Sequence, residues 1–203
     1  MNQEKLNKEL IEYAKNGNLK LVKYLMAQGA DIHANDEESL RLASAKGYLE
    51  VVKYLVEHGA YIHLRGDEAL RLATLYNHLE VVKYLVEHGA DIHAKDDEAL
   101  RLASPNGHLE IVKYLVEQGA NIYAIHDESL ILASHKGYLE VVKYFLFECN
   151  MQIKQKTKAW LVERNQHQTL ELIEKRDSII KNYQDLKKLN INSMDNLGKK
   201  VKI

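Results

Sequence analysis

The feature that most constrains this chain is a repeat with a period of 30 residues. The segment LEVVKYLVEHGA occupies residues 49–60 and returns unchanged at 79–90, and LEIVKYLVEQGA follows at 109–120. Related copies begin at Leu19 (LKLVKYLMAQGA) and Leu139 (LEVVKYFLFECN), and a second block (SLRLAS, ALRLAT, ALRLAS, SLILAS) keeps the same phase from Ser39 onward. Self-similarity at a fixed period of this length predicts a solenoid of stacked repeats.

Each repeat predicts two short helices. In the first, the apolar positions Leu40 and Ala43 lie three residues apart and give the helix one inward face. The predicted N-cap carboxylates of this helix are Asp67, Asp97 and Asp127. Its predicted left-handed ends are Gly47, Gly107 and Gly137, with Asn77 as the tolerated substitute.

The second helix carries an apolar stripe of Leu49, Val52, Leu55 and Val56, with Lys53 on the outward side. A helix of about ten residues is not stable alone in water, so each pair must bury its apolar faces against its neighbours. The sequence therefore predicts an all-α solenoid whose stability is a sum of repeat and interface terms.

These motifs resemble the ankyrin repeat, on the blocks Ser39–Ala45, Gly47–Leu55 and Gly89–Ala94, over roughly residues 6–149. The segment YLVEHGADIHA is similar to repeats in the large ankyrin families of giant amoeba-infecting DNA viruses. The resemblance implies an ankyrin repeat solenoid of stacked helix-turn-helix units. It also implies a non-enzymatic protein-interaction module whose concave groove, along the turns and the first helices, binds a partner.

The repeat departs from the family pattern in two ways. It is three residues shorter than the usual unit, at the place of the family's β-hairpin finger, so we expect a shortened turn there. The family's Thr-Pro-Leu-His opening is absent, and its His becomes Arg41, Arg71 and Arg101, then Ile131. The shortened finger moves the expected contact surface toward the first helix.

Two regions are predicted: an array of about five units over residues 1–149, and a C-terminal region over residues 150–203. Cys149-Asn150 replaces Gly-Ala, so regular geometry should break there. The C-terminal region is expected to hold a degenerate capping repeat, an amphipathic helix and a loose basic tail after Asn190. The array has 16 Lys and Arg against 23 Asp and Glu, and the C-terminal region has 12 against 6. This division suggests either a basic partner for the array or a tail that folds back on it.

Composition bounds the remaining chemistry. A single cysteine and the lack of a secretory signal or long apolar run predict an intracellular protein that does not enter a membrane. The net charge of −1 gives no reason to expect nucleic-acid binding. No phosphate-binding loop, zinc signature or positioned nucleophile is present, so we expect no enzyme, no cofactor and a monomer.

Three recurring residue types have structural interpretations. The pairs His58/His63 and His88/His93 recur in successive repeats, roughly 10 Å apart, which is too far to share a zinc ion, so no metal site is expected. The arginines follow an acidic residue by four positions and are expected to form i,i+4 pairs, with a ladder between repeats as an extension. Tyr residues at 24, 54, 84, 114 and 144 are expected to be half-buried on the outer side of the second helices.

Positions that differ between repeats are candidates for partner contact, because stacking positions should be alike in every copy. The differing positions cluster at the end of the first helix and in the shortened turn. The predicted partner-binding residues are Lys46, Arg65, Leu75, Tyr76, Lys95, Asn106, Ile125, His126, Ile131 and His135. Two alternatives remain: an adaptor that links bound prey to an effector such as a ubiquitin ligase through residues 150–203, and a self-assembling scaffold.

Overall fold

The computed structural model describes the backbone of residues 2–200 and the side chains of residues 2–187. Over these ranges all regular secondary structure is helical. The chain divides into two compact units, residues 1–141 and residues 142–203, with the boundary inside the short helix α10 (Leu139–Lys143).

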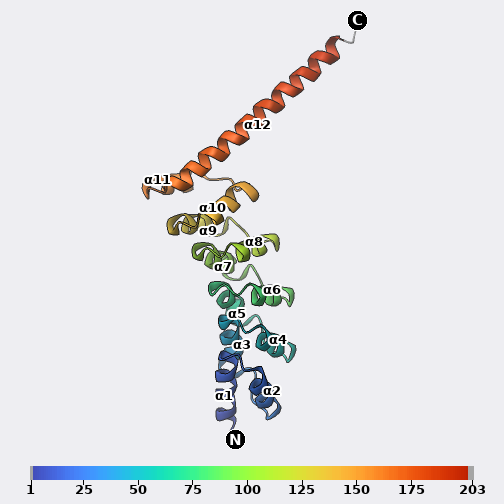
Figure 1. The fold of residues 1–203 in the computed structure, drawn as a ribbon, viewed down its shortest axis with the longest axis vertical. Helices are drawn as coiled ribbons and strands as arrows, with labels where there is room; N and C mark the ends of the chain where they lie inside the picture. Colours follow the sequence, from blue (N-terminus) through green and yellow to red (C-terminus); the bar gives the residue numbers. More distant parts are fainter. Residues whose placement is uncertain (1, 201–203) are drawn as a thin grey trace. The chain divides into compact units, whose positions relative to one another are not determined.

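The first unit is a stack of helix pairs. The pairs are α1 (Gln3–Lys15) with α2 (Leu19–Ala27), α3 (Ala34–Lys46) with α4 (Leu49–Glu57), α5 (Leu64–Leu75) with α6 (Leu79–Glu87), α7 (Ala94–Ala103) and its 3-10 turn η1 (Ser104–Asn106) with α8 (Leu109–Glu117), and α9 (Ala124–Lys136) with the start of α10. The first helices pack on one another in chain order, and the second helices form a second layer beside them (Figure 1). The predicted all-α repeat solenoid is confirmed.

The core between these layers is built from the positions that repeat without change. Leu40 and Ala43 of α3 are fully buried, and so are their counterparts in α5, α7 and α9. In the second helices, Val52 and Leu55 are buried as predicted, and Val51, which the predicted stripe omitted, is buried as well. Burial of each leucine or valine side chain stabilises the folded chain by about 1.5–3 kcal/mol.

The first helices end as the sequence predicts. Gly47, Gly107 and Gly137 have φ angles of 76°, 71° and 79°, and Asn77 takes the same left-handed conformation at 64°. In this conformation the Gly47 N–H donates to the Ser44 carbonyl at 3.2 Å, so the last turn keeps its hydrogen bonds.

The second unit begins with a change of helix type. Residues Tyr144–Glu148 form a π-helical turn, η2, where the other repeats have a plain second helix. The left-handed position after it falls on Asn150, with a φ of 49°, and not on Cys149. Burial raises the pKa of the Cys149 thiol, more than its hydrogen bond with Tyr144 lowers it. The predicted break in geometry at this point is confirmed.

Helices α11 (Gln155–Glu163) and α12 (His167–Lys200) follow η2. They lie where the sequence predicts a degenerate capping repeat and an amphipathic helix. The buried side chain of Arg176, on α12, donates a hydrogen bond to the Met151 carbonyl and two to the Asp177 carboxylate. Helix α12 continues to Lys200, through most of the segment after Asn190 that the sequence predicts to be loose.

Candidate protein-interaction surface

The shortened turn before each first helix has a left-handed conformation. In α5, Arg65, Gly66 and Asp67 have φ angles of 53°, 68° and 54°, and the same three positions of α3, α7 and α9 are also left-handed. A left-handed residue other than glycine costs roughly 1–2 kcal/mol, so this turn needs support from the surrounding structure. Each repeat is three residues shorter than the usual unit, and one left-handed turn takes the place of the family's hairpin finger.

The arginines of α5 and α7 support this turn. The Arg71 guanidinium donates to the carbonyls of Gly66 at 3.1 Å and Arg65 at 3.3 Å, and Arg101 makes the corresponding bonds to Lys95 and Asp96. These two side chains, and Arg41 of α3, also pair with a glutamate of the following repeat. These ladder pairs are Arg41–Glu68 (3.0 Å), Arg71–Glu98 (2.8 Å) and Arg101–Glu128.

The observed partners of these arginines contradict one prediction and confirm another. The predicted i,i+4 pairs are absent from the described contacts of Arg41, Arg71 and Arg101. The acidic residue four positions before each arginine ends the left-handed turn, and this conformation directs its side chain inward. The predicted ladder between repeats is present, at a separation of 27 residues. Arg71 and Arg101 thus each hold their own turn and the next repeat.

The acidic residue that ends each left-handed turn is buried, and its role differs from the predicted one. The carboxylate Oδ1 of Asp97 accepts hydrogen bonds from the backbone N–H of Asn121 at 2.8 Å and from His93 Nδ1 at 3.0 Å. Asp67 makes the same pair of bonds with Asp91 N–H and His63. The N-cap prediction for Asp67 and Asp97 is therefore wrong: each carboxylate ties its turn to the chain segment that follows the second helix.

The histidines have hydrogen-bonded structural positions. His58 and His88 donate from Nδ1 to the carbonyls of Tyr54 and Tyr84, at 2.7 and 2.8 Å, in the last turn of the second helix. Their rings also lie against the rings of those tyrosines. In the part of the chain whose side chains are described, no group of three or more His, Cys, Asp or Glu residues is arranged to hold a metal ion.

The tyrosine stripe on the second helices is buried to different extents. Tyr24 is exposed and Tyr84 is buried, with Tyr54 and Tyr114 between them. Burial raises the pKa of Tyr84 and of Tyr114. The stripe is therefore part of the packing between second helices more than a free surface.

The predicted binding residues lie along two opposite ends of the first helices. We call the left-handed turns (residues 35–37, 65–67, 95–97 and 125–127) the turn edge, and the opposite ends (residues 15–18, 45–48, 75–78, 105–108 and 135–138) the helix-end edge. Arg65, Lys95, Ile125 and His126 lie on the turn edge; Lys46, Leu75, Tyr76, Asn106 and His135 lie on the helix-end edge; Ile131 lies between them on α9.

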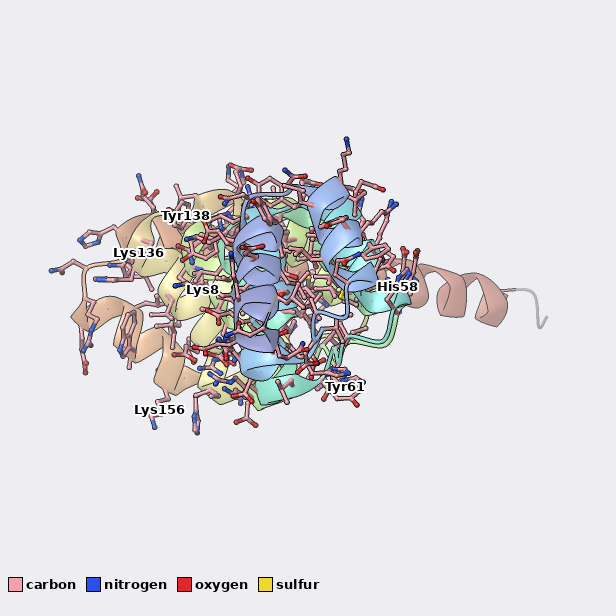
Figure 2. All side chains as sticks on the ribbon, turned by 90° about the horizontal axis from the view of Figure 1, so that it is seen from below. Lys8, His58, Tyr61, Lys136, Tyr138 and Lys156 are labelled. Atoms are coloured by element: carbon pink, nitrogen blue, oxygen red, sulfur yellow. The ribbon has the colours of Figure 1, made fainter. Side chains whose placement is uncertain are left out.

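A first helix of about ten residues separates the two edges by roughly 15 Å. In Figure 2, Tyr61, which adjoins the turn edge, and Tyr138, on the helix-end edge, lie toward opposite ends of the first helices. The sequence predicts one groove for all of these residues, whereas in the structure they lie along two separate edges.

Beside the turn edge is an apolar recess, and none of its lining residues is among the predicted binding residues. It has a volume of about 510 Å³ and is lined by Val56, Ala60, Tyr61, Ile62, His63 and Leu64. Tyr61 stacks on the His33 ring at 4.2 Å between centroids and leaves most of its surface exposed. Tyr61 and Leu64 replace the Asp and Ala of other repeats, which is the sequence signal for this recess.

On the helix-end edge, aromatic rings cover the glycines that end the first helices. The Tyr48 ring lies against Gly17 and the Tyr138 ring against Gly107, while His78 covers Gly47 in the same way. A side chain at any of these glycines would collide with the ring above it. Tyr48 and Tyr138 remain 38% and 39% exposed, which repeat-to-repeat comparison of the sequence did not reveal.

Comparison with known proteins identifies the architecture. The family described as "Ankyrin repeats (3 copies)" matches residues 10–96 and 93–157, which is more than half of the chain. The chain belongs to the ankyrin repeat family. A comparison with curated proteins gives no match. Ankyrin repeats generally mediate protein–protein interaction. Along the described part of this chain, no helix combines the length and apolar character needed to cross a membrane.

Proposed function

We propose that this chain is a non-enzymatic module that binds a partner protein through the face formed by its first helices, as a monomer inside the cell. The observation that carries the proposal is the contrast between stacking and exposed positions. The buried leucine of the first helix is the same in four successive repeats, at residues 40, 70, 100 and 130. Six residues further on, the exposed positions read Lys46, Tyr76, Asn106 and Lys136.

Apolar side chains in exposed positions support this surface. Tyr76 is 56% exposed and Ile125 is 44% exposed, so neither is required for the packing of its own repeat. Large apolar and aromatic side chains of this kind are the usual anchors of protein interfaces. We include His135 and Ile131 of α9 with them, since both differ from their counterparts in the other repeats.

The test compares a surface variant with a matched control. The variant combines Tyr76→Ala, Ile125→Ala and His135→Ala in the full chain, and the control is Tyr24→Ala, whose ring is 55% exposed on the second helix α2. Affinity capture followed by mass spectrometry should lose its specific partner with the variant and keep it with the control. Thermal unfolding should change little in both. Capture that survives all three substitutions contradicts the proposal.

An adaptor role for the C-terminal unit is the second candidate, because α12 has an apolar stripe exposed to solvent. Ile179, Tyr183 and Leu186 recur at the i, i+4, i+7 spacing of one helix face, and all three are more than half exposed. An adaptor would bind prey through the array and an effector through this stripe. The full-length variant Ile179→Ser, Tyr183→Ser, Leu186→Ser would then retain the prey and lose the effector, whereas loss of neither protein contradicts the adaptor role.

A further inference from the structure

The two edges differ in how their charges are used. On and beside the turn edge, nearly every cationic side chain is already paired within the array. Arg65 pairs with Asp36 at 2.7 Å, and the three ladder arginines pair with Glu68, Glu98 and Glu128. The guanidinium of Arg65 lowers the pKa of the Asp36 carboxyl, as expected for a close ion pair. Lys95 has no ion pair among the described side chains, but the exposed carboxylate of Asp96 is its neighbour in the same turn.

On the helix-end edge, Lys15 of the first repeat pairs with Glu12 at 3.6 Å, but two other lysines lack this internal compensation. Lys46 and Lys136 are exposed, and neither has an ion pair or hydrogen bond among the side chains that the structure describes. Residues 45–48, 75–78, 105–108 and 135–138 contain no Asp or Glu.

The nearest acidic residues are those of the first turn of the second helices, and they already have partners. Glu50 pairs with Lys53 at 2.9 Å, Glu80 with Lys83 at 2.9 Å and Glu110 with Lys113 at 3.2 Å. The helix-end edge therefore has positive charge, at Lys46 and Lys136, that its neighbouring residues do not compensate.

Aromatic side chains accompany these lysines. Three tyrosines on this edge are partly exposed: Tyr48 (38%), Tyr76 (56%) and Tyr138 (39%). They come from different repeats, and successive first helices pack about 8–10 Å apart. Because the Tyr48 and Tyr138 rings lie against glycines of the preceding repeat, each is held with one face toward the chain. An aromatic ring that is already fixed loses little conformational entropy when a partner covers it. The edge thus offers fixed apolar surface between unpaired cations.

We propose that the helix-end edge binds an acidic segment of the partner protein that carries aromatic or aliphatic side chains. The carboxylates of that segment would pair with Lys46 and Lys136, and its apolar side chains would pack on Tyr48, Tyr76 and Tyr138. This inference rests on the proposed function and names the chemistry of the partner. It differs from the basic partner suggested by the excess of acidic residues in residues 1–149, because complementarity depends on the charges at the contact surface itself.

A nucleic acid is a less suitable polyanion for this edge. Nucleic-acid sites present several cations toward a run of phosphates, whereas here two lysines are separated by three repeats on a body with more acidic than basic residues. A protein segment with spaced carboxylates and apolar side chains between them matches the arrangement of lysines and tyrosines better.

The test is a selection of displayed random peptides, about a dozen residues long, on the full-length chain. The selected peptides should be enriched in Asp and Glu together with Phe, Tyr, Leu or Ile. A synthetic copy of the most enriched peptide should bind at least about tenfold more weakly to the Lys46→Glu, Lys136→Glu variant, and Tyr76→Ala should weaken it further. Raising the salt concentration should also weaken binding, since the pairs are exposed.

Two control variants separate this inference from the proposed function. Lys95→Glu changes a charge on the turn edge, and Lys23→Glu changes one on the outer side of α2; neither should alter binding of the selected peptide. If Lys95→Glu abolishes binding and the Lys46→Glu, Lys136→Glu variant does not, the first-helix face remains the binding surface. The proposal that the peptide binds at the helix-end edge is then wrong.

Further outcomes overturn the inference directly. Enrichment of Lys and Arg in the selected peptides would do so, as would displacement of the acidic peptide by single-stranded RNA at equal concentration. Binding that only Lys23→Glu abolishes, or no enrichment over the starting pool, would contradict both the inference and the proposed function.

Discussion

The buried carboxylate of Asp97 allows a quantitative test of how the left-handed turn is held. Its side chain is only 8% exposed, and its Oδ1 accepts from the Asn121 N–H at 2.8 Å and from His93 Nδ1 at 3.0 Å. Replacing Asp97 by Ala removes both hydrogen bonds. At about 0.5–1.5 kcal/mol for each bond, the free energy of unfolding should fall by about 2 kcal/mol.

Urea unfolding followed by circular dichroism measures this change, and the thermal midpoint should fall by about 4–8 °C for a chain of this size. Asp97→Asn should lose about half as much, because an amide oxygen still accepts from the Asn121 N–H. The matched control is Asp96→Ala, one residue earlier in the same turn and exposed, which should change stability by less than about 0.5 kcal/mol. Equal losses for Asp96→Ala and Asp97→Ala would show that the buried carboxylate does not stabilise the turn.

Three other predictions concern single residues. Gly66→Ala should destabilise the chain by about 1 kcal/mol in urea unfolding, because alanine must adopt the left-handed φ of 68° that glycine takes at no cost; an unchanged midpoint would contradict this. The pKa of Asp36 should lie below 3.8 in an NMR titration and return toward 3.8 in Arg65→Met, since the depressed pKa depends on that guanidinium; a pKa unaffected by the substitution would exclude the ion pair in solution. Cys149 should react with iodoacetamide at neutral pH more slowly in the folded chain than in urea, because burial raises the pKa of its thiol and lowers the thiolate fraction; equal rates would contradict the burial.

Much of the fold was predictable because the repeat multiplies each signal. Leu40, Ala43 and Gly47 recur at a fixed period in successive units, so their assignment to core and helix end did not depend on any one copy. The three-residue deletion was also visible in the sequence. Its conformation was not, because three consecutive left-handed residues are unfavourable locally and exist only through contacts with the rest of the repeat.

The errors have the same origin. Asp97 has the sequence position of an N-cap, but the left-handed turn directs its carboxylate to Asn121, which lies 24 residues later. Arg71 follows Asp67 by four residues, yet it pairs with Glu98 in the next repeat for the same reason. Local spacing rules assume a right-handed helix at both positions, and here that assumption fails.

The candidate surface was predictable in its members and not in its arrangement. Comparing repeats identified Tyr76 and Ile125, and both are exposed in the structure. The sequence did not show that they belong to different edges, or that Tyr48 and Tyr138 remain partly exposed above glycines. Exposure depends on which side chain of a neighbouring repeat covers a position, and repeat comparison alone does not contain that information.

The most direct test of the central claim is site-specific photo-crosslinking from the first-helix face. Benzoylphenylalanine would replace Tyr76 in one sample and Tyr24, equally exposed on α2, in another, and both would be irradiated with the captured partner. We expect a covalent adduct from position 76 and none from position 24. An adduct from position 24 alone, or equal yields from both positions, would contradict a binding surface formed by the first helices.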